Sequence, residues 1–169
     1  MRKQQKGFSL IELLIVVAII LIIAAIAIPN LMRAKMAANN SSAAASERTI
    51  VTGEVGYEAA YPATGYTALS ALGGVAPCTP APAGACMIDN NLATNGTPAG
   101  TGKSGYNFAA AAGANALTQF ITTGTPLSAS SGSAYYCAVE DGVVRSVPSA
   151  GGTTALTNAA CYTTNPLAN

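Results

Sequence analysis

Glu12 is the residue whose position most clearly calls for a chemical explanation, because it is the one charged side chain in the apolar run of residues 8–28. A carboxylate at the centre of a membrane helix costs about 2.5–3.5 kcal/mol on insertion scales, and less near a helix end. A nearby cation would offset that cost. The sequence therefore predicts that Glu12 has a positively charged partner.

Four cysteines form the second group with possible chemistry, and all of them lie beyond the apolar run. Their even number and the oxidising location expected there predict two disulfides. Of the three possible pairings we favour Cys78–Cys86, which closes a short loop, and Cys137–Cys161, which fixes the C-terminal tail to a strand. Loop entropy assigns these bridges about 2.5 and 3.5 kcal/mol. A zinc site is disfavoured because no C-x-x-C spacing is present, and no metal or cofactor is expected.

Composition excludes several classes of function. The chain of 169 residues has no histidine, so His-based catalytic relays and His-ligated metal sites are absent. Only 9% of residues are charged and the formal net charge is +1, which argues against nucleic acid as the main partner. The pair Glu140 and Asp141 falls far short of a calcium shell, and we interpret it as part of a turn. These features disfavour an enzyme and favour a structural or secreted protein.

The apolar run itself is long enough to cross a membrane. Its 21 residues would form a helix of roughly 32 Å, about the thickness of a bilayer core. The preceding Arg2, Lys3 and Lys6 place the N-terminus on the cytoplasmic side. Two other interpretations are a signal peptide cut after Ala27 and a plain membrane anchor. Glu12 fits neither of them.

The segment from Lys6 to Val17, KGFSLIELLIVV, resembles the start of type IV pilins and of type II secretion pseudopilins. The resemblance implies that a prepilin peptidase cuts after Gly7 and methylates the new N-terminus at Phe8. Glu12 matches the family's assembly residue, whose partner would be the Phe8 amine of a neighbouring subunit. The seven-residue leader and Phe8 resemble the type IVa branch. Pro29 ends the apolar run, and either a simple kink or a helix segment that loosens on assembly is expected there.

This resemblance also implies an organisation for the whole chain. Residues 1–7 would be a leader, residues 8–61 a long helix whose first half lies in the membrane or the filament core, and residues 62–169 an external head. The subunit would stay in the inner membrane until the pilus assembly machinery adds it to a homopolymer, and it would then be part of an extracellular filament. No specific nucleic acid is expected as a partner.

Beyond the apolar run the chain stays helix-prone as far as Tyr61, and Pro62 is a sensible stop. Tyr57 and Tyr61 share one helix face. We expect them to pack the helix onto the head rather than to form an electron-hopping pair. Asn39, Asn40 and the two serines that follow weaken the helix propensity locally.

The remainder predicts an α+β fold, with a long helix and a four-stranded antiparallel head. Residues 62–104 carry repeated turn signals and are expected to form a long loop. Strands are predicted over 105–110, 117–123, 134–139 and 142–147. Asp141-Gly142 favours a hairpin between the last two strands, because such turns need a positive φ.

We therefore expect a type IV pilin, the structural subunit of a pilus, and not an enzyme. A type II secretion pseudopilin is the first alternative, and a secreted soluble protein is the alternative from another class. The sequence leaves open whether the filament serves twitching, adhesion, DNA uptake or electron transfer, and whether the subunit is major or minor.

Overall fold

The computed structural model describes residues 9–148 and 157–163. Its main helix, α1, runs Leu10–Ala60, close to the predicted helix that ends at Tyr61. The chain divides into two compact units, Met1–Lys35 and Met36–Asn169. The first unit therefore holds the apolar start of α1, and the second holds the rest of α1 with the head.

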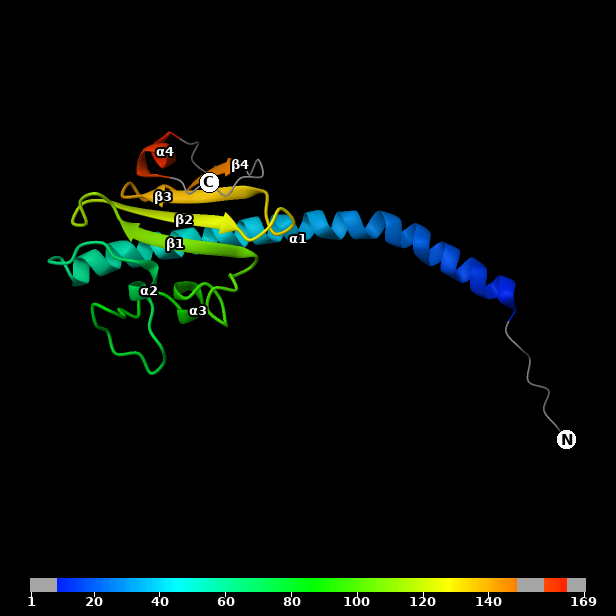
Figure 1. The fold of residues 1–169 in the computed structure, drawn as a ribbon, viewed down its shortest axis with the longest axis horizontal. Helices are drawn as coiled ribbons and strands as arrows, with labels where there is room; N and C mark the ends of the chain where they lie inside the picture. Colours follow the sequence, from blue (N-terminus) through cyan, green and yellow to red (C-terminus); the bar gives the residue numbers. More distant parts are fainter. Residues whose placement is uncertain (1–8, 149–156, 164–169) are drawn as a thin grey trace. The chain divides into compact units, whose positions relative to one another are not determined.

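The head contains a four-stranded antiparallel sheet in the order β1-β2-β3-β4 (Figure 1). The predicted α+β fold class is confirmed. The strands are β1 (Tyr106–Ala112), β2 (Phe120–Pro126), β3 (Ala134–Val139) and β4 (Arg145–Pro148).

The hairpin between β3 and β4 is present but longer than its sequence suggests. Gly142 has the expected positive φ of 72°, and its N–H donates to the Val139 carbonyl at 2.9 Å. Strand pairing resumes only where Cys137 faces Arg145. The predicted strand start at residue 142 is therefore wrong, because the turn occupies the residues before Arg145.

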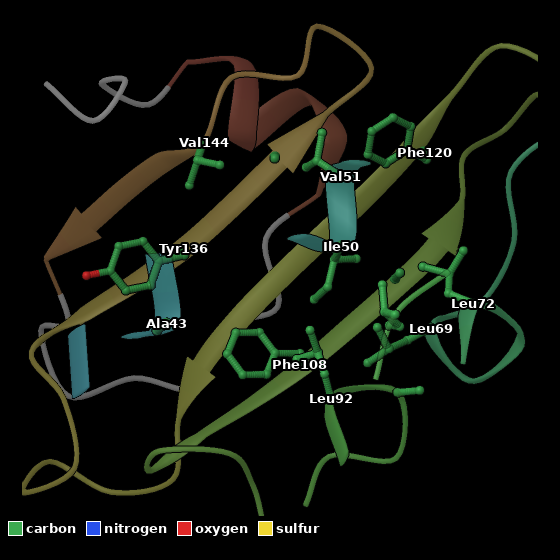
Figure 2. Close-up of a cluster of buried hydrophobic side chains, with 14 of the residues drawn as sticks. Ala43, Ile50, Val51, Leu69, Leu72, Leu92, Phe108, Phe120, Tyr136 and Val144 are labelled. Carbon is green, nitrogen blue, oxygen red and sulfur yellow. The ribbon is translucent and has the colours of Figure 1, made fainter. Parts of the chain in front are cut away.

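One face of the sheet packs against the second half of α1. Figure 2 shows Ile50 and Val51 of the helix among Phe108, Phe120 and Tyr136 of the strands. Alternate residues of a strand point to opposite faces, so the neighbours of Tyr136 in β3 point away from α1. There α4 (Asn158–Tyr162) contacts β3. This second cover explains why nearly all of β3 is buried.

The predicted loop over residues 62–104 contains two short helices, so the expectation of an irregular segment was wrong in part. They are α2 (Leu69–Leu72) and α3 (Asn90–Ala93). The Asp89 carboxylate caps α3 by accepting from the Leu92 N–H at 3.0 Å. Both short helices contain buried leucines. A single helical turn forms at each place because it directs these side chains into the core.

Asn95, just beyond α3, covers the free edge of β1. Its side-chain N–H donates to the Phe108 carbonyl at 2.6 Å, and its side-chain oxygen accepts from the Phe108 N–H. The residue adopts a positive φ of 55°. The following Gly96 donates its own N–H to the Asn91 carbonyl at 2.7 Å. A side chain thus takes the place of a fifth strand at one point of this edge.

The asparagines that weaken the helix propensity form hydrogen bonds that hold α1 against the head. Asn39 donates to the Ser131 carbonyl at 2.7 Å. The side-chain oxygen of Asn40 accepts from the Tyr106 hydroxyl at 2.7 Å. Hydrogen bonds to distant residues offset the small propensity cost, so α1 passes through this segment without a break.

Candidate functional site

The N-terminal turn of α1 is closed by Glu12. Its Oε2 accepts a hydrogen bond from the Ser9 N–H at 3.0 Å, and both residues are exposed. Ser9 precedes Glu12 by three positions, which is the spacing of a capping box. The S-x-x-E pattern that forms this cap is visible in the sequence. In the single chain, Glu12 therefore satisfies a free N–H group of its own helix.

The apolar part of α1 is exposed around its whole circumference. Consecutive residues from Leu10 to Ile22 are all exposed, including large aliphatic side chains on every side. By length and composition, α1 could cross a membrane, and it is the one such helix among the described residues. Two of the predicted site residues, Gly7 and Phe8, lie outside the described residues. Pro29 lies inside α1 with helix on both sides, where it lacks the N–H that would donate to the Ala25 carbonyl.

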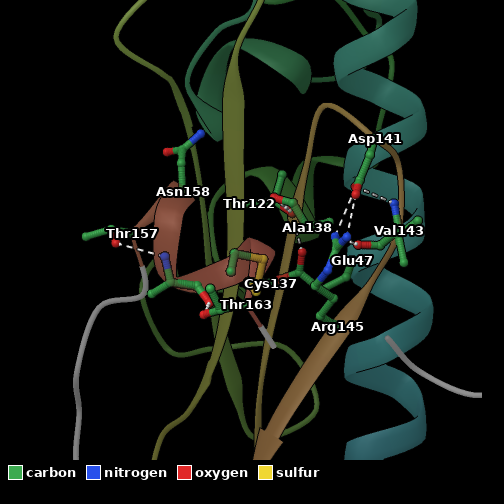
Figure 3. Close-up of a disulfide and its surroundings, with 12 residues drawn as sticks. Glu47, Thr122, Cys137, Ala138, Asp141, Val143, Arg145, Thr157, Asn158 and Thr163 are labelled. Carbon is green, nitrogen blue, oxygen red and sulfur yellow. Dashed lines mark hydrogen bonds and ion pairs between the residues drawn. A yellow bond between two sulfur atoms is a disulfide. The ribbon is translucent and has the colours of Figure 1, made fainter. Parts of the chain in front are cut away.

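The cysteines form the two pairs favoured from the sequence, Cys78–Cys86 and Cys137–Cys161. The second bridge joins β3 to α4 (Figure 3). Beside it the Thr157 hydroxyl caps α4 by accepting from the Ala160 N–H at 3.3 Å. The bridge thereby fixes α4 to the face of the sheet opposite α1.

In the acidic pair at the β3–β4 turn, Asp141 already has a cationic partner. The Asp141 carboxylate forms an ion pair with Arg145 and also accepts from the Val143 N–H at 3.0 Å. The hydrogen bond from Arg145 is the main reason why the pKa of Asp141 is lowered. The Arg145 guanidinium also lies 5.8 Å from the centre of the Tyr162 ring. These contacts support the interpretation of Asp141 as part of a turn.

Two glutamates that the sequence analysis missed are fully buried between α1 and the head. Glu47 accepts from the Thr122 hydroxyl at 2.6 Å, and burial raises its pKa to about 8. Glu54 accepts from the Thr67 N–H at 3.1 Å, and burial raises its pKa to about 7. The signal that could have found them is their spacing with the apolar residues of the same helix face, Ala43, Ile50 and Tyr57.

The rings of Tyr57 and Tyr61 lie side by side, with their centres 4.8 Å apart. Tyr57 is buried, and its hydroxyl donates to the Pro82 carbonyl at 2.8 Å. Pro82 lies in the loop closed by Cys78 and Cys86. Tyr57 therefore holds this loop against α1, which is the packing role predicted for it.

Comparison with known proteins assigns the N-terminal segment. Residues 2–28 match the family model of the prokaryotic N-terminal methylation motif. The chain is also 59% identical over 39 residues to the type IV wide pilus major component PilA4 of Thermus thermophilus. That similarity covers 23% of this chain and 30% of the relative. No solved structure matches the chain.

Proposed function

We propose that this chain, whose N-terminal segment is that of a type IV pilin, is a structural subunit that polymerises into a type IV pilus. The observation that carries the proposal is the position of Glu12. It is the single charge in the apolar run, and it lies within the matched methylation motif. The fold supports the proposal, because α1 continues from this motif into an α+β head.

Processing would come first. A prepilin peptidase at the cytoplasmic face of the inner membrane would cut after Gly7 and methylate Phe8. Arg2, Lys3 and Lys6 would hold the leader on that side. Glycine has no side chain to hinder access to the peptide bond before Phe8. The mature subunit would stay in the membrane through α1, with its disulfide-bonded head outside.

Assembly would then change the partner of Glu12. In the single chain its carboxylate accepts from the Ser9 N–H. In a filament the exposed aliphatic side chains of α1 would be buried against other copies, and Glu12 would meet the Phe8 amine of a neighbour. An unpaired buried charge costs about 3–5 kcal/mol, so the pair would select the correct register between subunits.

Pro29 would serve the same helix at the end of the apolar run. The Ala25 carbonyl lacks its helical donor there, so this turn would be the easiest one of α1 to loosen when subunits pack or when the filament is stretched. A role in a type II secretion system is the less favoured alternative, because the matched relative is described as a pilus component.

The experiment compares variants of Glu12 in cells that make the filament, measuring sheared-fibre yield against subunit left in the membrane. Glu12→Gln keeps an acceptor for the Ser9 N–H but removes the charge. We expect normal insertion and cleavage with a large loss of fibres. Glu12→Ala should behave in the same way, and Glu12→Asp should be intermediate because its reach is shorter.

Ser9→Ala is the matched control, because it changes the same helical turn and keeps both the Ser9 backbone N–H and the Glu12 charge. We expect it to assemble normally. Normal fibre yield from Glu12→Gln would overturn the charge-pairing role. If Glu12→Gln were also lost from the membrane pool, the defect would lie in insertion or processing, and the assembly role of Glu12 would be rejected.

A further inference from the structure

Glu47 occupies a closed niche in the interface between α1 and the sheet. Its Oε2 accepts from the Thr122 hydroxyl of β2 at 2.6 Å. Its Oε1 has no hydrogen-bond partner among the described residues. A Cβ added at Gly124 of β2 would lie 2.8 Å from this Oε1 and 3.1 Å from the Phe108 ring of β1. The carboxyl group therefore fits only because a glycine faces it, and an aromatic ring closes the side of the niche.

Among the described residues, no cation of the surrounding elements is engaged with this carboxyl group. Within residues 9–148 and 157–163, the one ion pair joins Arg145 of β4 to Asp141. Lys103, just before β1, donates to Ser46 at 3.1 Å. Arg48, the next residue of α1, is exposed. An ionised Glu47 would thus be a buried charge with one hydroxyl donor, which is strongly unfavourable.

We propose that the protonation state of Glu47 controls the helix–sheet interface. While its carboxyl group is neutral, α1 stays packed against β1 and β2. When the carboxyl group ionises, this packing is lost. The neutral group can remain in the niche without a counter-charge. The ionised group needs water, and water reaches Oε1 only if the sheet moves away from α1. The proposal is independent of the role of Glu12 in assembly.

The direction of the effect follows from the titration of Glu47. Burial raises its pKa from 4.5 to about 8, so the folded chain holds a proton that the unfolded chain releases. The contribution of Glu47 to stability is therefore greatest below pH 4.5 and falls as the pH rises to about 8. Glu54 contributes a smaller effect of the same sign, with a pKa of about 7. Burial, together with the negative charges of Glu58, Glu140 and Glu54, raises the pKa of Tyr66.

The test is urea unfolding of the full chain in detergent micelles at pH 6 and pH 9, followed by circular dichroism. A pKa of about 8 for Glu47 predicts that its ionisation lowers the folding equilibrium constant roughly 100-fold between these two pH values. Glu47→Gln cannot ionise, so its equilibrium constant should fall roughly 100-fold less than that of the wild type. Glu58→Gln is the matched control on the same helix and should keep the wild-type pH dependence. An equal pH dependence in wild type and Glu47→Gln overturns the proposal.

Two further measurements locate the effect. At pH 9, amides of α1 and β2 should exchange with solvent faster in the wild type than in Glu47→Gln, after correction for intrinsic rates. In the wild type labelled with ¹³C at its glutamates, one carboxyl resonance should titrate near pH 8. Thr122→Val should shift that resonance, which assigns it even if Glu47→Gln does not fold. A Glu47 resonance that titrates near pH 4.5 overturns the proposal.

Discussion

Removing the bridge between β3 and α4 tests how α4 is held against the sheet. The change is Cys137→Ala with Cys161→Ala. These residues are 24 positions apart, and the entropy of a loop of this size corresponds to about 3.5 kcal/mol. The same treatment of Cys78 and Cys86, 8 positions apart, gives about 2.5 kcal/mol.

Burial increases the difference between the two bridges in how much each stabilises the fold. Cys137 and Cys161 are fully buried and pack with Val139 and Ile121, so replacing both sulfur atoms also leaves a small void worth roughly 1 kcal/mol. Cys78 is exposed and Cys86 is half-buried, so a comparable void is not expected there. We therefore expect the free energy of unfolding to fall about 2 kcal/mol further without the Cys137–Cys161 bridge than without the other.

The assay is urea unfolding of both double variants and of the wild type in the same detergent, under conditions where the slope against urea is unchanged. Reduced wild type should be less stable than either variant, because it lacks both bridges. Equal losses from the two double variants, or a larger loss without Cys78–Cys86, would refute the reasoning. Such a result would mean that α4 stays in place through its other contacts, such as the Asn158 side chain donating to the Phe120 carbonyl at 3.1 Å.

Two further predictions follow from single positions. Gly124→Ala should destabilise the chain by about 1–3 kcal/mol, because the new methyl group would lie 2.8 Å from Glu47 Oε1; Gly84→Ala, whose nearest contact would be an ordinary 3.5 Å, should be close to neutral in the same unfolding assay. The mature protein should begin at an N-methylated Phe8, and intact-mass measurement with N-terminal sequencing checks this. A mature chain that began at Ile28 would instead support the secreted soluble protein.

The elements of this fold were predictable where the sequence pattern is local. The long helix, the four strands and the hairpin at Gly142 follow from apolar runs, alternation and turn residues. The short helices α2 and α3 were missed because a single helical turn leaves almost no periodic pattern. Asn39 and Asn40 suggested a weak helix because asparagine has a low helix propensity. The hydrogen bonds that compensate for it involve Ser131 and Tyr106, which are distant in the sequence.

Among the functional residues too, those with a local sequence signal were predictable and those that depend on distant contacts were not. Glu12 was found because a charge inside an apolar run is conspicuous in any single sequence. Glu47 and Glu54 were missed because glutamate on a helix is normally exposed. Their burial depends on the Thr122 hydroxyl, the Thr67 N–H and the glycine at position 124, none of which lies near them in the chain.

The edge contact made by Asn95 also affects the chemical lifetime of the protein. Asparagine followed by glycine is a sequence prone to deamidation, in which the glycine nitrogen attacks the side-chain carbonyl and expels ammonia. Here the Asn95 side chain is held by both backbone groups of Phe108, and the Gly96 N–H is engaged by the Asn91 carbonyl. Ring closure would have to break all three hydrogen bonds and uncover the edge of β1. The native fold thus slows the deamidation of Asn95, and local unfolding around Asn95 and Gly96 would remove that protection.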